Sequence, residues 1–229
     1  MSIWVIFGLF MLLSLLVSQQ LKSRFKKYAQ IPTNGNISGK EVAEKMLRDH
    51  GIYDVQVISV PGQLTDHYNP LKKTINLSKV VYYGQHISAA AVAAHETGHA
   101  VQHAQAYMWL NLRTALVPLQ NVSATIMNII FIGLFIGSLF LGGMNIQFAG
   151  SIIIACYSIF TLFSVITLPV EFDASRRALV WLNSSGITSM ISHPKAKDAL
   201  KWAAMTYVVA ALASLATLLY FIAAFSGRD

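Results

Sequence analysis

The chain has 229 residues, of which 55% are hydrophobic and only 12% are charged. Soluble globular domains carry about 25% charged residues, so this composition excludes an ordinary soluble domain and indicates a membrane protein. The net charge of +7 would also suit a nucleic-acid-binding protein. The Lys and Arg residues flank uncharged runs, however, as the positive-inside rule predicts for membrane proteins. We therefore expect the lipid bilayer as a partner, and no nucleic acid.

The first uncharged run covers residues 2–20. Four basic residues follow this run: Lys22, Arg24, Lys26 and Lys27. A secretory signal peptide instead carries its basic residues before the apolar stretch. The run also lacks a clear cleavage site of small residues. We therefore expect residues 1–20 to form a retained transmembrane anchor.

Two further uncharged runs predict the remaining spans. The run at 114–170 is 57 residues long. A transmembrane helix needs about 20 residues, so this run has room for two spans joined by a turn, for which 142–145 (Gly-Gly-Met-Asn) is the best candidate. The run at 203–225 supplies a fourth span. The sequence thus predicts a mainly α integral membrane protein with about four transmembrane helices and a small α+β unit.

The elements of that small unit lie between the first two runs. Ser38 and Glu41 form a capping-box pattern that opens an amphipathic helix. Alternating, β-branched patterns then predict strands at 53–60 and 73–78, with a short candidate strand at 63–68.

The next predicted helix, 89–106 with Ser88 as its cap, contains the sequence AAHETGHA. His95 and His99 are four residues apart and lie on one helix face, where two imidazoles can hold one metal ion. Glu96 lies about 100° around the helix from His95, so it can reach a water on the metal without being a ligand. This is the H-E-x-x-H pattern of zinc hydrolases, so we expect the small α+β unit to be a zincin-like catalytic unit. The pattern needs a third ligand from elsewhere in the chain.

Two carboxylates, Glu171 and Asp173, follow the long uncharged run. A carboxylate near the bilayer is costly unless it has a partner, which would be either Arg176 or Arg177, or the metal ion. If this segment is helical, Glu171 shares a face with Ser175, while Asp173 points about 200° away from Glu171. Only one of the two carboxylates can therefore face the histidine pair.

Three other residues are alternatives for roles in the site. His103 lies one turn beyond His99, but three ligands along one straight helix cannot easily surround an ion, so we expect His103 to be a neighbour of the ligands. Asp66 is a further acidic candidate. His67 could stabilise an oxyanion, although a histidine in a surface turn is the simpler interpretation.

Three stretches, DHYNP, AAHETGHAVQHA and LPVEFDASRRAL, resemble the YugP-type neutral zinc metallopeptidase family of bacterial membranes, over nearly the whole chain. They are more distantly similar to the HtpX and CAAX-processing membrane proteases. The resemblance implies one Zn²⁺ per chain, bound by His95, His99 and Glu171, with Glu96 as the general base. Ser175 stands where the distant relatives have an aspartate. The expected neighbours of the ligands are His103, Asp173, Ser175 and Arg176.

We therefore expect a zinc metalloendopeptidase of the bacterial plasma membrane, in which Glu96 takes a proton from a zinc-activated water. An extended protein or peptide substrate could add to the edge of the strand that holds Thr74, Ile75 and Asn76, beside His67. One alternative is a zinc-binding membrane sensor or assembly factor without hydrolysis, which would not need Glu96. Another is a structural membrane protein whose histidines only form hydrogen bonds. The oligomeric state stays open.

These expectations divide the chain into five segments: the anchor (1–20), the catalytic unit with the H-E-x-x-H helix (21–118), a transmembrane hairpin (119–170), a segment with the third zinc ligand (171–202) and a C-terminal transmembrane helix (203–225). The basic stretches at 22–27 and 176–201 place the catalytic unit and the ligand-bearing segment on the cytoplasmic side. The N-terminus, the turn at 142–146 and the C-terminus are then outside.

Overall fold

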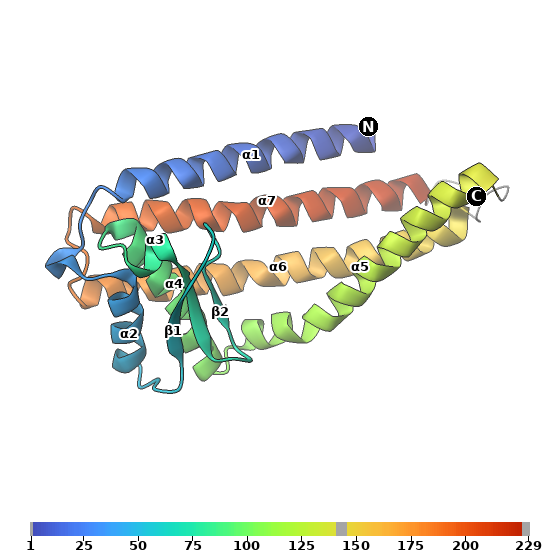
Figure 1. Ribbon diagram of the computed structural model, residues 1–229. Helices are drawn as coiled ribbons and strands as arrows, with labels where there is room; N and C mark the ends of the chain where they lie inside the picture. The colour runs from blue at the N-terminus through green and yellow to red at the C-terminus, as the bar shows by residue number, and fades with distance from the viewer. Residues whose placement is uncertain (1, 141–145, 226–229) are drawn as a thin grey trace. The chain divides into compact units, whose positions relative to one another are not determined.

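The computed structural model describes residues 2–140 and 146–225 and is mainly helical, with one sheet of three short strands (Figure 1). Within these residues, four helices are long and apolar enough to cross a membrane, which confirms the predicted fold class. They are α1 (Ile3–Tyr28), α5 (Met108–Phe140), α6 (Ile146–Ser184) and α7 (His193–Phe225). The turn predicted at 142–145 lies outside the described residues.

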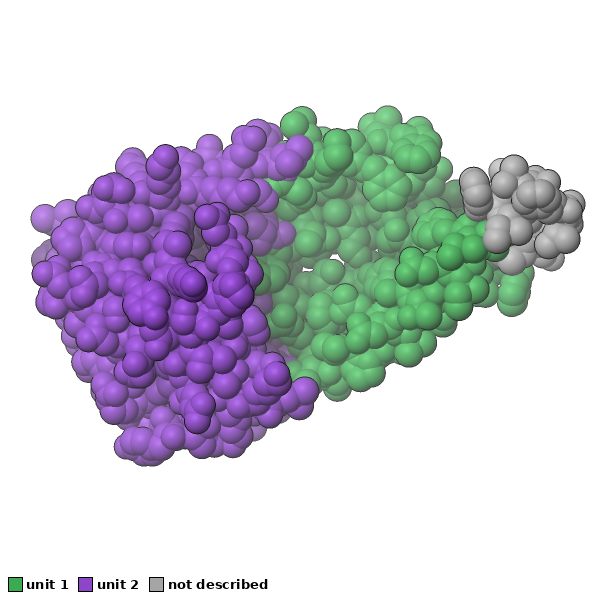
Figure 2. Space-filling model, in the orientation of Figure 1, with its two compact units in different colours: residues 1–14, 112–168, 207–229 green, residues 15–111, 169–206 purple. Residues whose placement is uncertain are grey.

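The chain divides into two compact units, which Figure 2 shows in different colours. Unit 1 comprises residues 1–14, 112–168 and 207–229, and unit 2 comprises residues 15–111 and 169–206.

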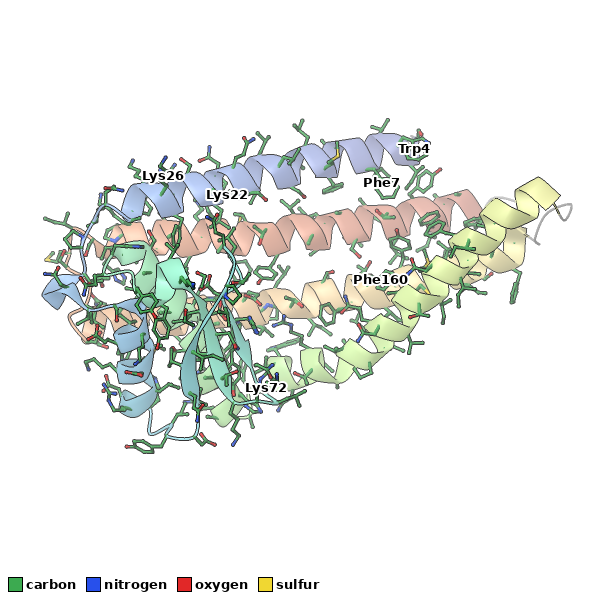
Figure 3. All side chains as sticks on the ribbon, in the orientation of Figure 1. Trp4, Phe7, Lys22, Lys26, Lys72 and Phe160 are labelled. Atoms are coloured by element: carbon green, nitrogen blue, oxygen red, sulfur yellow. The ribbon has the colours of Figure 1, made fainter. Side chains whose placement is uncertain are left out.

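Unit 1 consists of helical segments with an apolar surface. A small core cluster of side chains holds it together: Met127, Ile130, Ala149, Ile153 and Cys156. Trp4 and Phe7 stand exposed on the part of α1 that belongs to unit 1, and Lys22 and Lys26 lie at the other end of the same helix, which belongs to unit 2 (Figure 3). An exposed apolar surface that ends in basic residues suits a helix that contacts lipid and reaches the polar interface.

Unit 2 contains the three-stranded sheet, whose strands are β1 (Gln56–Val60), β2 (His67–Asn69) and β3 (Thr74–Ser78). The strand order is β1-β3-β2, with β1 parallel and β2 antiparallel to β3. The expectation that Thr74, Ile75 and Asn76 offer a free edge is therefore wrong, because β3 is paired on both sides. The edge available on that side of the sheet belongs to β2, which includes His67.

The helices of unit 2 begin where local side chains can cap them. The capping box of Ser38 and Glu41 opens α2 (Gly39–Asp49) as predicted, with the Ser38 N–H donating to Glu41 Oε2 at 2.7 Å. Helix α4 (Ile87–Ala104) starts two residues earlier than predicted, because Nδ1 of His86 accepts the Ala89 N–H at 3.2 Å. Ser88, the predicted cap, instead donates to the carbonyl of Phe25 at 2.7 Å.

Helix α4 is the centre of unit 2. Its alanines at 89–91, 93 and 94 are fully buried, and it packs against α2, the sheet and the short helix α3 (Lys79–Tyr82). Small side chains allow these elements to approach the helix closely, so α4 has no solvent-facing side over most of its length. Polar residues on such a helix need partners within the protein.

Helix α6 continues without interruption through Pro169 and the acidic stretch that follows. Residues 169–184 of α6 belong to unit 2 together with α4. The carboxylates of Glu171 and Asp173 are thus presented by a regular helix, and the helix geometry assumed from the sequence applies to them.

Candidate metal centre

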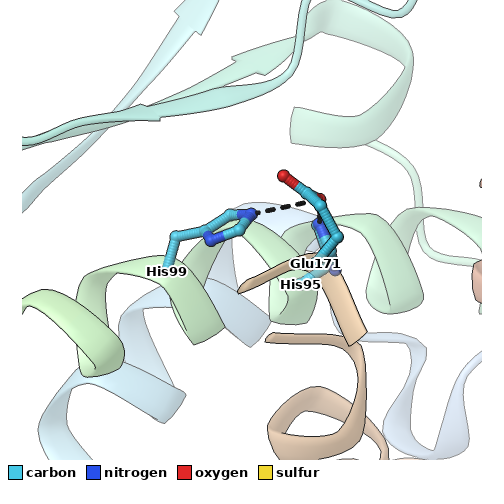
Figure 4. A group of neighbouring side chains, drawn as sticks. All are labelled: His95, His99 and Glu171. Carbon is cyan, nitrogen blue, oxygen red and sulfur yellow. Dashed lines mark ion pairs between the residues drawn. The ribbon is translucent and has the colours of Figure 1, made fainter. Parts of the chain in front are cut away.

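His95 and His99 of α4 and Glu171 of α6 bring their side chains together (Figure 4). Glu171 Oε2 lies 3.2 Å from Nε2 of His95 and 3.6 Å from Nε2 of His99. One ligand atom from each residue lies within 4.8 Å of the others, and the three residues are 9%, 8% and 2% exposed. The arrangement is thus a buried, three-residue cluster with a donor set of two imidazoles and one carboxylate.

Gly98 allows α6 to come close enough for Glu171 to reach the histidines. A Cβ atom built on Gly98 would lie 2.7 Å from the carbonyl oxygen of Ala174, which is too close for any side chain. Ala174 itself is fully buried at this crossing. The glycine inside the H-E-T-G-H sequence therefore serves the packing of the two helices that carry the cluster.

Gln102 determines which nitrogen of His99 carries the hydrogen. The amide Nε2 of Gln102 donates to the carbonyl of Val170 at 2.8 Å and to Oδ2 of Asp173 at 2.9 Å. Both partners are acceptors only, so the amide orientation is defined, and its Oε1 faces Nδ1 of His99 at 3.0 Å. Nδ1 must then be the donor, which leaves a lone pair on Nε2 in the neutral ring.

His95 has a comparable partner on its far side. The hydroxyl oxygen of Ser175 lies 3.1 Å from Nδ1 of His95, and both side chains are buried. A hydroxyl can accept the Nδ1 hydrogen and so orient the Nε2 lone pair of His95 toward the cluster. The helix geometry derived from the sequence places Ser175 on the same face as Glu171, and the structure shows that both residues contact His95.

The donor atoms of the cluster fit a bound cation. The lone pair on Nε2 of His99 faces a carboxylate oxygen, an arrangement that is repulsive unless a proton or a metal ion lies between them. Burial alone would lower the pKa of His99, but the hydrogen bond and charge of Glu171 overcome that effect and raise it. Ligand atoms about 2.0–2.1 Å from a tetrahedral Zn²⁺ would lie about 3.3 Å from one another. Glu171 Oε2 lies 3.2 Å from Nε2 of His95 and 3.6 Å from Nε2 of His99, which is close to that spacing.

Glu96 lies beside the cluster and outside the donor set. Its side chain is 9% exposed, and its Oε2 accepts the backbone N–H of Tyr68 at 3.1 Å. Tyr68 pairs with Ile75 in the sheet, yet its N–H points away from β3 and toward Glu96. The outer edge of β2 therefore runs past the glutamate of the H-E-x-x-H motif.

The other predicted site residues have different partners. His103 lies 2.9 Å from the Tyr68 hydroxyl through Nδ1, and Nδ1 of His67 donates to the carbonyl of Thr65 at 2.8 Å. Asp66, which precedes β2, accepts the N–H of Ser78 at the end of β3 at 2.7 Å. None of these three residues belongs to the metal-capable cluster identified within 2–140 and 146–225.

Asp173 follows the first of the two interpretations that the sequence left open for the acidic pair, which is pairing with arginine. It forms ion pairs with Arg176 and Arg177, as expected for a charge near the bilayer. Asp173 also accepts a hydrogen bond from Gln102, which in turn contacts His99. Asp173 is therefore connected to the cluster through one side chain, that of Gln102. The sequence analysis missed Gln102, although its position three residues after His99 places it on a neighbouring part of the same buried helix.

Comparison with known proteins identifies the family of the chain. The model of a family described as "Putative neutral zinc metallopeptidase" matches residues 3–226. A relative from Bacillus subtilis (strain 168), described as "Putative membrane protease YugP", is 41% identical over 211 residues, which cover 92% of this chain and 91% of the relative. No solved structure matches. The four apolar helices and the relative's description indicate a multi-pass membrane protein. By sequence, the chain belongs to the neutral zinc metallopeptidase family that this model describes.

Proposed function

We propose that the protein is a membrane-embedded zinc metalloendopeptidase that holds one Zn²⁺ per chain through His95, His99 and Glu171. The observation that carries the proposal is the convergence of two histidine Nε2 atoms and one carboxylate next to a separate glutamate, Glu96. Catalytic zinc sites use three protein ligands and keep a further position open. Zinc, when bound, supplies a Lewis acid that polarises a peptide carbonyl and makes water easier to deprotonate.

Glu96 is the proposed general base and, later, the general acid. The Tyr68 N–H holds Oε2 of Glu96 by a hydrogen bond, and we assign the proton transfer to Oε1 of the same carboxylate. Glu96 takes the proton of the attacking water and returns it to the leaving amine. Because Gln102 and Ser175 orient the two imidazoles from behind, the cluster is preorganised before substrate arrives.

The proposed substrate is an extended peptide that pairs with the outer edge of β2. The Tyr68 N–H supports this edge because its hydrogen bond to Glu96 places the edge beside the base, and the peptide would pair with other backbone groups of that edge. Pairing through the backbone would hold the scissile bond near Glu96 with little dependence on side-chain identity. We further propose that the site lies on the cytoplasmic side of the bacterial plasma membrane, on the basis of the basic stretches at 22–27 and 176–201.

The test combines metal content with hydrolysis. Protein purified in detergent, stripped with a chelator and reloaded with Zn²⁺ should bind one zinc per chain and cleave an unfolded protein such as reduced casein. Glu96→Gln should keep its zinc and lose about 100- to 10,000-fold in cleavage rate, because only the proton transfer is removed. Stoichiometric zinc with no cleavage by the unaltered protein would favour the metal-binding sensor instead. Full cleavage by Glu96→Gln would exclude the assigned base.

A further inference from the structure

A concave site lies in unit 2, between the part of α6 that follows Glu171 and the first part of α7. It is a groove of about 640 Å³, which we call the α6–α7 groove. Three cationic side chains, Arg176, Lys197 and Lys201, line it. None of its lining residues is acidic. A groove lined by three cations and no acidic residue favours an anionic ligand.

The two lysines are available to bind such a ligand. Lys197 and Lys201 are four residues apart on α7 and therefore present their ammonium groups on one helix face. Both are exposed, and within the part of the chain that the structure describes neither forms a hydrogen bond or an ion pair. Two like charges at this spacing repel each other, and an anion between them would relieve that repulsion.

Arg176 completes the cationic set from the α6 side. It pairs with Asp173, yet its side chain remains 70% exposed. A guanidinium carries five N–H donors, so one carboxylate contact leaves donors for a second anion. Phosphate oxygens suit this combination of a planar guanidinium and two ammonium groups.

The rest of the lining mixes neutral polar residues with apolar ones, and the residues nearest the predicted spans are apolar. The uncharged run of α6 ends at residue 170, just before Phe172, and the uncharged run of α7 begins at residue 203, just before Ala204 and Met205. These three residues line the same groove as the cations. The three cations therefore lie on the charged parts of the two helices, and the end of the groove next to the uncharged runs is apolar. A phospholipid has the same order of a charged headgroup and apolar chains.

We propose that the α6–α7 groove binds one anionic phospholipid, with its phosphate on Arg176, Lys197 and Lys201 and an acyl chain along Phe172 and Met205. An acidic peptide would use the cations but not the apolar end, which is why the observations favour a lipid. The site is distinct from the metal cluster, although Ser175 lines the groove and its hydroxyl lies 3.1 Å from Nδ1 of His95. This inference does not depend on hydrolytic activity.

Native mass spectrometry of the detergent-purified full chain tests the proposal. The protein is titrated with phosphatidylglycerol or with phosphatidylcholine of the same acyl chains. We expect one phosphatidylglycerol per chain at concentrations where phosphatidylcholine does not bind. The double substitution Lys197→Ser with Lys201→Ser should weaken phosphatidylglycerol binding about 10- to 30-fold, since each basic residue near a membrane surface contributes several-fold. Lys197→Arg with Lys201→Arg should retain it.

A matched control separates the groove from general surface charge. Lys22 and Lys26 of α1 are also four residues apart and border an uncharged run, but they do not line the groove. Lys22→Ser with Lys26→Ser should leave phosphatidylglycerol binding within about twofold of the original protein. Equal losses in the two double variants, or equal binding of both lipids, would overturn the specific site. Displacement of the lipid by millimolar inorganic phosphate would also overturn it, because the groove would then be a site for small anions.

Discussion

The side-chain oxygen of Gln102 lies 3.0 Å from Nδ1 of His99, on the side of the ring that faces away from Glu171. Since the amide nitrogen of Gln102 is committed to two acceptors, this contact leaves His99 only one neutral tautomer. The same contact connects the metal-facing imidazole to Asp173 and its two arginines. Gln102 is therefore a positioning residue for the proposed zinc site.

Gln102→Leu should weaken zinc binding about 10- to 100-fold, the usual cost of losing a side chain that orients a metal ligand. Competition with a zinc-sensitive dye measures the affinity directly. The Gln102→Glu variant should also bind zinc weakly, because the new carboxylate would face that of Asp173. Adding Asp173→Asn gives this carboxylate an amide donor as its partner, so the double variant should recover zinc affinity. No recovery in the double variant would mean that Gln102 acts only by filling space.

Glu171→Ala should abolish cleavage and stoichiometric zinc binding, because it removes one of the three proposed ligands and the charge that offsets Zn²⁺. Asp173→Ala should retain most of its zinc, since Asp173 acts through Gln102 and does not touch the cluster. Mass spectrometry measures the zinc content per chain of both variants. His99→Ala is the reference for a lost ligand. If Asp173→Ala resembles His99→Ala while Glu171→Ala keeps its metal, the assignment of the third ligand is wrong.

The chelator-treated protein should become less stable as the pH rises. Glu171 raises the pKa of His99 above the ordinary value of 6.5, so the charged imidazole stabilises the metal-free fold fully below about pH 6.5. That contribution is lost as the pH passes through the raised pKa of the folded state. Thermal unfolding in detergent with chelator, scanned from pH 5.5 to 9, measures the trend.

Glu171→Gln is the control for that pH scan, because an uncharged amide no longer favours the imidazolium. Its unfolding temperature should depend less on pH over the same range than that of the unaltered protein. An identical pH dependence in both proteins would assign the effect to other groups.

Labelling of single cysteines should show on which side of the membrane the catalytic unit lies. In a Cys156→Ala background, Leu71→Cys replaces a residue that is 95% exposed in unit 2, and Ser2→Cys marks the N-terminus. An impermeant thiol reagent added to intact cells should label position 2 and spare position 71, since the basic stretches favour a cytoplasmic catalytic unit. The opposite labelling would reverse the proposed orientation and leave the metal centre unaffected.

Local patterns were sufficient for many of the correct predictions. Uncharged runs predicted the membrane-spanning helices, because hydrocarbon tolerates few charges within about 20 residues. The capping box of Ser38 and Glu41 marked the start of α2, since both partners lie within one turn. The spacing of His95 and His99 predicted their common face for the same reason. Each of these features depends on residues that are close in the sequence.

The tertiary structure decided what depends on distant segments. The strand order placed β3 in the centre and left β2 as the edge beside Glu96, because pairing partners are chosen by packing and not by strand propensity. The close crossing at Gly98 brought Glu171 to the histidines. Gln102 acquired its function only through contacts with Val170 and Asp173, which are 68 and 71 residues away in the chain. Periodicity reports which face of a helix a side chain occupies, whereas the groups that meet that face are determined by how the whole unit packs.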